Sequence, residues 1–192
     1  MDKVINSMRT ILVTGGAGFI GSHLSERLLK EGNRVLVIDN FNNYYDPAIK
    51  RNNVEEVKKT CIENNISLDN YKVFEGDIRD NEFLKEVFSN KIDSMMHLAA
   101  CAGVRPSIED PSLYYDVNIT GTVNLLEICR ENNVKQFVFA SSSSVYGNNE
   151  KVPFAESDRV DNPISPYAAT KKSGELLCHT YHHLFDMNIA CL

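Results

Sequence analysis

Three glycines at intervals of three residues, Gly15, Gly18 and Gly21, follow a short apolar run and open a segment with helical periodicity. Glycine permits a tight turn at the first position, lets backbone N–H groups approach a phosphate at the second, and lets helix and strand pack closely at the third. The N-terminus of the helix adds partial positive charge. The pattern therefore predicts a pyrophosphate-binding loop, with a glycine turn that holds no ligand as the alternative.

Asp39 ends the next apolar run, 18 residues after Gly21. A carboxylate at this place accepts hydrogen bonds from the ribose of an adenine dinucleotide and repels a 2'-phosphate. Together with the glycines it predicts NAD as the cofactor, in preference to NADP. The alternative is an aspartate that serves only as a turn residue at the end of a strand.

Tyr167 and Lys171 are four residues apart, which places both side chains on one face if the segment is helical. A phenol with a pKa of about 10 is a poor base at neutral pH, but an adjacent ammonium and an oxidised nicotinamide favour the phenolate. Tyr167 could then take a proton from a hydroxyl group while hydride leaves for NAD. Ser142 follows another apolar run, and its hydroxyl could bridge the substrate oxygen and the phenolate. The Tyr-Lys spacing alone is weak, because such pairs are common on helix surfaces.

Short apolar runs alternate with longer segments of helical periodicity, which indicates a parallel sheet with intervening helices. We predict strands that are buried on both faces, at residues 10–14, 34–38, 71–74, 94–98, 136–140 and 188–192. Helices are predicted at residues 18–31, 47–64, 81–89, 111–132 and 165–185, and a functional loop at 141–162. The predicted fold class is α/β, a doubly wound parallel sheet with helices on both faces. Residues 1–8 form a short tail and residues 9–192 one domain.

The composition excludes several classes of protein. A net charge of −6 and no cluster of basic residues argue against nucleic-acid or membrane partners. Five scattered cysteines predict neither a disulfide framework nor a zinc site, and a cytoplasmic location fits them best. His179 and His183 share a helix face, but no acidic residues accompany them in a metal-ligand pattern, so no metal site is expected.

Several blocks of sequence resemble the extended short-chain dehydrogenase/reductases, which have a Rossmann-type NAD-binding domain. They are TGGAGFIGSHL (14–24), DNFNNYYDP (39–47), GDIRD (76–80), HLAACAGVRPSIEDP (97–111), VNITGTVNLLE (117–127), SSSSVYG (141–147) and YAATKKSGE (167–175). Within that family they are most similar to the UDP-glucuronate and UDP-glucose 4-epimerases. The resemblance runs along nearly the whole chain.

The resemblance implies a role for each matching residue. The residues on the pyrophosphate would be Phe19 and Ile20, those on the adenosine ribose Asp39 and Asn40, those beside the adenine Asp77 and Ile78, and those on the nicotinamide side Leu98, Ala99 and Ala100. The catalytic residues would be Ser142, Tyr167 and Lys171, the last two also touching NAD, and the sugar contacts Ser141, Ser142, Ser143 and Tyr167. Asn118 is similar to an asparagine that the family carries inside a helix.

The resemblance also implies a reaction. Related sugar 4,6-dehydratases carry an Asp-Glu pair after the catalytic hydroxyl residue, where this sequence has Ser143 and Ser144. The implied reaction is therefore reversible oxidation at C4 of a UDP-sugar with bound NAD, with UDP-glucuronate favoured over UDP-glucose and UDP-N-acetylhexosamines. A dehydratase, a decarboxylase and a non-catalytic NAD-binding module remain alternatives, and a homodimer is a possible assembly.

Members of the family continue beyond the last predicted strand with a segment similar to R-F-F-x-V-Y-G-P and a substrate-binding subdomain. Neither is present within the 192 residues. We therefore expect a chain truncated at its sixth strand, with an unpaired apolar sheet edge at residues 188–192, weak NAD binding and little turnover. Epimerase activity of the 192-residue product at rates usual for the family would contradict this.

Overall fold

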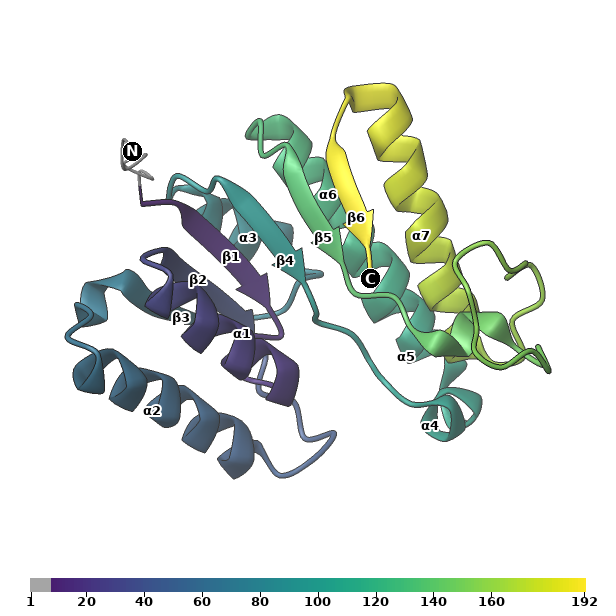
Figure 1. The fold of residues 1–192 in the computed structure, drawn as a ribbon, viewed down its shortest axis with the longest axis horizontal. Helices are drawn as coiled ribbons and strands as arrows, with labels where there is room; N and C mark the ends of the chain where they lie inside the picture. Colours follow the sequence, from purple (N-terminus) through teal and green to yellow (C-terminus); the bar gives the residue numbers. More distant parts are fainter. Residues whose placement is uncertain (1–7) are drawn as a thin grey trace.

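The computed structural model describes residues 8–192, so residues 1–7 of the predicted tail lie outside the described part. Six parallel strands form one sheet in the order β3-β2-β1-β4-β5-β6 (Figure 1). The strands are β1 (Thr10–Thr14), β2 (Arg34–Asp39), β3 (Tyr71–Glu75), β4 (Ser94–His97), β5 (Gln136–Phe139) and β6 (Asn188–Cys191). The order reverses between β1 and β4, which places the predicted binding edge at the carboxyl ends of these two strands.

Helices cover both faces of the sheet, as the sequence predicts (Figure 1). Helices α1 (Phe19–Lys30) and α2 (Pro47–Glu63) pack on one face, and α3 (Asn81–Phe88), α6 (Gly121–Glu131) and α7 (Pro166–Phe185) pack on the other. Successive side chains of β1 point to opposite faces of the sheet. Ile11 and Val13 therefore pack on the face covered by α1 and α2, and Leu12 packs on the face covered by α3, α6 and α7. The fold class predicted from the sequence is confirmed.

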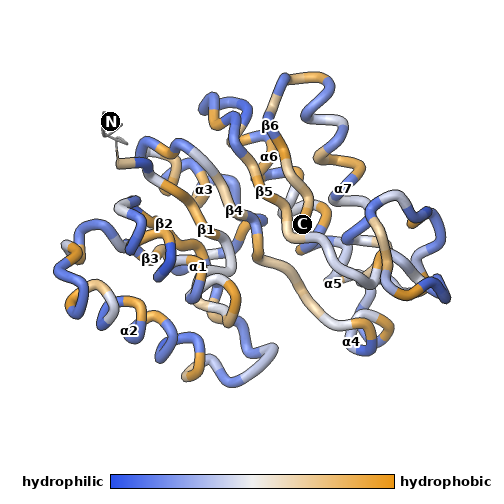
Figure 2. Tube along the Cα trace, in the orientation of Figure 1, coloured by the Kyte–Doolittle hydropathy of each residue, from blue (hydrophilic) through white to orange (hydrophobic). Residues whose placement is uncertain are grey.

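The apolar residues of the strands and of the inner helix faces form this core, as the hydropathy colouring shows (Figure 2). Leu125, Leu126 and Ile128 of α6 are all buried within the chain. They pack against the sheet rather than presenting a free apolar face. Among the described residues, none of the helices combines the length and apolarity that a bilayer crossing needs.

The prediction of one continuous α-helix at 111–132 is wrong, because a π-helical turn interrupts it. The structure divides it into α5 (Pro111–Tyr115), a π-helical turn (Asp116–Thr120) and α6, and a further helix, α4 (Val104–Glu109), precedes it. A π turn inserts one extra residue into the helical repeat, and such turns are frequent at functional sites. Here the turn carries the buried Asn118.

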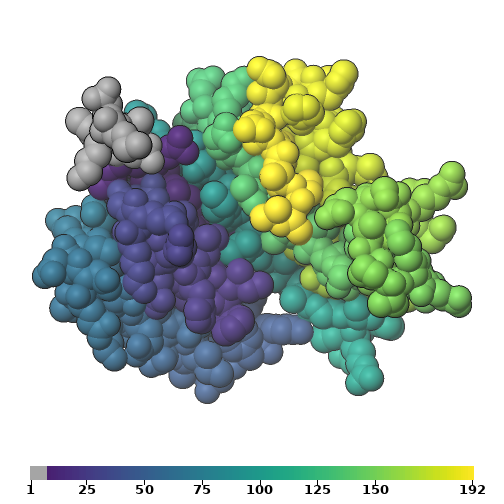
Figure 3. All heavy atoms as spheres, viewed as in Figure 1, coloured from purple at the N-terminus to yellow at the C-terminus, as the bar shows by residue number. Residues whose placement is uncertain are grey.

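The predicted burial of the last strand on both faces is also wrong. β6 has a partner only in β5, and Asn188, Ala190 and Cys191 are exposed. β6 lies at the surface beside α7 in the space-filling view (Figure 3). An edge strand can be apolar in sequence without being covered, so apolar content alone does not give burial. The other strands match their predicted ranges to within one residue at each end.

Candidate active site

The glycine loop connects β1 to α1 in a conformation that only glycine accepts easily. Gly15 has a φ of +69°, and a Cβ atom there would lie 2.9 Å from the backbone nitrogen of Ala99. The loop is closed by hydrogen bonds from Gly15 N–H to the carbonyl of Ile38 (2.7 Å) and from Gly18 N–H to that of Gly15 (3.1 Å). The loop therefore lies directly against the segment that leaves β4.

The first turn of α1 has no side-chain cap. Gly18 occupies the N-cap position without a capping hydrogen bond, and the first turn contains no acidic residue. The side chains of Phe19 and Ile20 point to solvent and are 76% and 67% exposed, so what they bring to the site is their backbone N–H groups. Uncapped amides at a helix N-terminus favour an anion.

A cavity of about 200 Å³ lies over this loop, at the carboxyl edge of β1, β2 and β4. Nine of the predicted cofactor residues line it: Gly15, Gly18, Asp39, Asn40, Asp77, Ile78, Leu98, Ala99 and Ala100. Five predicted cofactor residues are not in its lining: Phe19, Ile20 and Gly21, which adjoin it in the chain, and Tyr167 and Lys171 on the last helix. Other lining residues were not predicted from the sequence, among them Asn42, Tyr44, Tyr45, Lys50 and Cys101.

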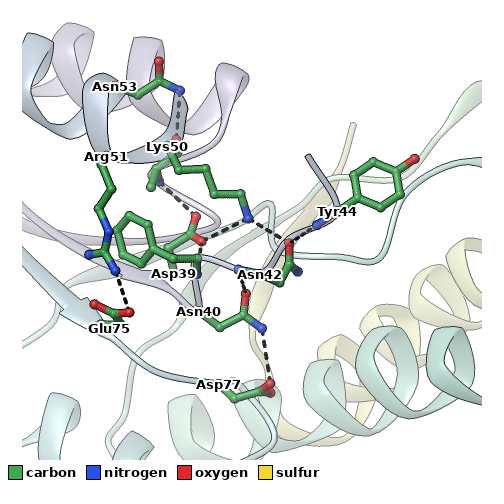
Figure 4. A network of polar contacts seen from close by, with 11 residues as sticks. Asp39, Asn40, Asn42, Tyr44, Lys50, Arg51, Asn53, Glu75 and Asp77 are labelled. Atoms are coloured by element: carbon green, nitrogen blue, oxygen red, sulfur yellow. Dashed lines mark hydrogen bonds and ion pairs between the residues drawn. The ribbon is translucent and has the colours of Figure 1, made fainter. Parts of the chain in front are cut away.

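Asp39 fastens the glycine loop to the end of β2 (Figure 4). Its carboxylate accepts hydrogen bonds from the N–H groups of Ala17 (3.1 Å) and Phe41 (2.9 Å). The ammonium of Lys50 lies 3.5 Å from one Asp39 oxygen and donates to the side-chain oxygen of Asn42 (2.9 Å). Both Asp39 and Lys50 are buried, so the pair neutralises charge that would otherwise be costly inside the protein. The structure thus gives Asp39 a structural role beside its predicted contact with ribose.

Asn40 and Asp77 both line the cavity, and the side-chain amide of Asn40 donates to Asp77 at 3.3 Å (Figure 4). Asp77 also accepts three hydrogen bonds from Arg79, one from its backbone and two from its guanidinium. These contacts, led by the guanidinium, lower the pKa of Asp77 to about 2. The carboxylate is therefore charged at every physiological pH.

Helix α7 positions the predicted catalytic pair. Ser165 caps it by accepting a hydrogen bond from Ala168 N–H (3.1 Å), and Pro166 occupies the first position of the helix. Lys171 is buried, and its ammonium donates to the carbonyl of Ala140, just beyond β5, at 2.7 Å. Tyr167 is half-buried one turn earlier. The helix is therefore held against the carboxyl end of β5 by the predicted lysine itself.

Tyr114 connects Tyr167 to the cavity. Its hydroxyl donates a hydrogen bond to the carbonyl of Ala102, which lines the cavity, and its ring meets that of Tyr167 edge-on with centroids 6.3 Å apart. Tyr167, Lys171 and Ser142 are not themselves in the lining of the 200 Å³ cavity. They lie at the same carboxyl edge of the sheet, beside β5.

The predicted serines have different surroundings. Ser142 caps the 3₁₀ turn Ser143–Tyr146 by accepting a hydrogen bond from Ser144 N–H (3.2 Å). Ser141 donates its hydroxyl hydrogen to Glu175 on α7, and Ser143 is exposed. The Ser142 oxygen is thus held by an acceptor contact, which leaves its hydrogen available to a ligand. Ser141 already has an acceptor within the chain.

Replacement of Lys171 by methionine is expected to reveal the cost of burying its charge. Burial lowers the pKa of Lys171 from 10.5 to about 8, so the unfolded chain binds this proton more tightly than the folded protein. Burial of the charged lysine lowers the free energy of unfolding by its full amount below pH 8. This destabilisation disappears as the pH rises from 8 to 10.5, so the free energy of unfolding of wild type should increase by about 3 kcal/mol relative to that of the variant. Urea unfolding of both proteins at pH 7.5 and 10.5, without cofactor, measures this difference.

Lys172→Met is the matched control, because it removes the neighbouring lysine, which pairs with Glu175 at 3.2 Å. The difference in unfolding free energy between wild type and Lys171→Met should change over this pH range. If it stayed constant, the buried ammonium would have an ordinary affinity for its proton.

The chain is similar to UDP-sugar epimerases in both sequence and fold. UDP-glucuronate 4-epimerase 4 of Arabidopsis thaliana is 49% identical over 191 residues, which cover 97% of this chain and 41% of that protein. The UDP-glucuronate 4-epimerase of Thermodesulfobacterium geofontis is 48% identical over 180 residues, covering 93% of this chain and 53% of the relative. The crystal structure of UDP-glucose 4-epimerase from Bifidobacterium longum in complex with NAD+ and UDP superposes with a TM-score of 0.84 at 33% identity. The superposition covers 95% of this chain and 52% of that protein.

The resemblance to nucleotide-sugar epimerases that the sequence predicts is confirmed by these similarities. The chain spans about half the length of the relatives it matches, or somewhat less. The family described as GDP-mannose 4,6 dehydratase matches residues 12–192. That match covers nearly the whole sequence, from the third residue of β1 to the residue that follows β6. The chain therefore belongs to the GDP-mannose 4,6 dehydratase family.

Proposed function

We propose that this chain is the cofactor-binding and catalytic part of an NAD-dependent nucleotide-sugar 4-epimerase. The observation that carries the proposal is the cavity over the glycine loop, because one wall of it continues through Tyr114 to the helix of Tyr167 and Lys171. Hydride transfer to and from a sugar requires a dinucleotide site and a proton-transfer site at one edge of the sheet.

The residues around the glycine loop fit NAD. The uncapped amides of α1 suit its pyrophosphate, Gly15 leaves no side chain between the loop and the cavity wall, and Asp39 lies at the place expected for a ribose contact. When bound, NAD would supply a hydride acceptor and return the hydride later in the same turnover. The structure of the enzyme from Bifidobacterium longum, which is a complex with NAD+ and UDP, supports this choice.

Three side chains would handle the proton. Tyr167 would accept it from the sugar hydroxyl that is oxidised, and Lys171 would favour the ionised phenol through its positive charge. The pKa of about 8 leaves most of the Lys171 side chains charged at neutral pH. Ser142, with a hydroxyl hydrogen free to donate, would bind the oxygen at which the charge develops.

Epimerisation is proposed in preference to dehydration, although the family carries the name of a dehydratase. Elimination of water needs an acid and a base beside the sugar, and Ser143 and Ser144 are neither at neutral pH. The relatives from Arabidopsis thaliana and Thermodesulfobacterium geofontis are both named as epimerases. Their names also favour UDP-glucuronate as the substrate, since they are more similar in sequence than the UDP-glucose 4-epimerase of Bifidobacterium longum.

UDP-glucuronate with deuterium at C4 tests the proposal. The protein, expressed together with any coding sequence that follows residue 192 in its gene, is incubated with this substrate and the products are analysed by NMR. We expect UDP-galacturonate that retains deuterium at C4, because the hydride that leaves this carbon returns to it. Loss of water or carbon dioxide would instead identify a dehydratase or decarboxylase, and NAD binding without conversion would identify a non-catalytic module.

A further inference from the structure

A buried histidine lies between the glycine loop and the helix of Tyr167. His97 is the last residue of β4, is 2% exposed, and contacts a threonine on each side. Its Nδ1 is 2.7 Å from the hydroxyl of Thr14, where β1 ends, and its Nε2 is 2.9 Å from the hydroxyl of Thr122 on α6. Desolvation, followed by the charge of Lys171, lowers the pKa of His97 to about 3, so the ring is neutral.

The neighbours of the ring decide which nitrogen carries the hydrogen. The Thr122 hydroxyl lies 2.6 Å from the carbonyl of Asn118, and a carbonyl only accepts, so the hydroxyl donates its one hydrogen there. Thr122 must then accept from His97, which places the hydrogen on Nε2. The bare Nδ1 accepts from Thr14, whose oxygen in turn accepts from Ala99 N–H at 3.2 Å.

Asn118 continues the same set of bonds toward α7. Its amide is paired with the backbone of Cys101, accepting from the N–H at 2.7 Å and donating to the carbonyl at 3.0 Å. It also donates to the hydroxyl of Thr170 at 3.0 Å, and Thr170 donates to the carbonyl of Tyr167 at 2.8 Å. The cavity wall at residues 98–101 is therefore held at Ala99 from one side and at Cys101 from the other.

We propose that His97 is a positioning residue, which acts in its Nε2–H form to fix the distance between the cofactor cavity wall and the helix of Tyr167. The inference rests on the proposed function. His97 does not line the cavity and acts only through other groups. Each donor in the set has one acceptor and each hydroxyl has its single hydrogen assigned, so the arrangement is unique. An Nδ1–H ring would leave the bare Nε2 facing the Thr122 oxygen with no hydrogen between them, and a protonated ring would take away the acceptor of the Thr14 hydroxyl hydrogen.

Variants at Thr122 test this, because Thr122 is buried beyond His97 and outside the cavity lining. Thr122→Val keeps the shape but removes the hydroxyl, whereas Thr122→Ser keeps the hydroxyl. We expect Thr122→Val to lower kcat about 10- to 100-fold, as a small misplacement of reacting groups does, with KM unchanged. Thr122→Ser should restore kcat to within about threefold of wild type. The ¹⁵N chemical shifts of the His97 ring should show a protonated Nε2 and a bare Nδ1.

The two proposals fail in different ways. A wild-type protein that does not interconvert UDP-sugars would end the proposed function, and with it the role given to His97. A wild-type protein that turns over while Thr122→Val retains its kcat would overturn the positioning role alone. So would a loss of kcat that Thr122→Ser does not restore, or a ring that carries its hydrogen on Nδ1.

Discussion

Replacing Tyr167 with phenylalanine is expected to lower kcat for UDP-sugar epimerisation about 100- to 10,000-fold, the range that general acid–base catalysis contributes. The change removes the phenolic oxygen alone and keeps the ring, which meets Tyr114 edge-on. NAD affinity should stay within about threefold, because the cavity over the glycine loop does not include the Tyr167 side chain. Steady-state kinetics and calorimetric titration with NAD measure the two quantities.

Tyr115→Phe is the matched control, since it makes the same chemical change at an exposed tyrosine of α5. Its kcat should remain close to that of wild type. If Tyr167→Phe retained more than about a tenth of the wild-type kcat, another group would have to move the proton, and the proposed role of Tyr167 would be lost.

The fold could be predicted from the sequence because its signals are local. Alternating apolar runs and helical segments give the strand and helix order, and in a parallel sheet the carboxyl ends of the strands meet at one edge. The sequence alone assigns Gly15 and Asp39 to that edge, and both line the cavity there. The glycine motif predicts the loop because it requires a backbone conformation that other residues rarely adopt, and Gly15 has that conformation with a φ of +69°.

The parts that could not be predicted depend on contacts between distant residues. Lys50 belongs to a helix that reads as a charged, solvent-facing stripe, yet its ammonium is buried against Asp39 and Asn42. Nothing in its neighbours along the sequence distinguishes it from Lys59, which remains exposed. The one observable hint is that it lies three residues after the block DNFNNYYDP, which ends at Pro47.

The hydrogen bonds of His97 could not be predicted either, because Thr14 and Thr122 are 83 and 25 residues away in the sequence. A histidine at the end of an apolar run is as consistent with a ligand-binding residue as with a buried one. Only the pairing of β1 with β4, which aligns Thr14 with His97, separates these possibilities. The π turn that aims Asn118 at Cys101 likewise follows from packing rather than from helical periodicity.

Replacing Gly21 with alanine is expected to weaken NAD binding about 10- to 100-fold, which corresponds to the 1–3 kcal/mol usual for overpacking. The new methyl carbon would lie 2.3 Å from the carbonyl oxygen of Gly15 and 2.6 Å from the Cα of Gly16. Both are backbone atoms of the phosphate loop, so the loop itself must move to relieve the contact. The uncapped amides at the start of α1 would then lose their alignment with the pyrophosphate.

Gly32→Ala separates this effect from a general loss of stability. Gly32 follows the other end of α1, has a φ of +84°, and has no atom within 4 Å of the added carbon. The left-handed conformation should cost that variant about 1–2 kcal/mol of stability and leave NAD affinity intact. Thermal unfolding and calorimetric titration of both variants give the comparison. Because Gly21→Ala strains the binding loop and Gly32→Ala strains only a distant turn, equal NAD affinity in the two would mean that the loop does not bind the cofactor.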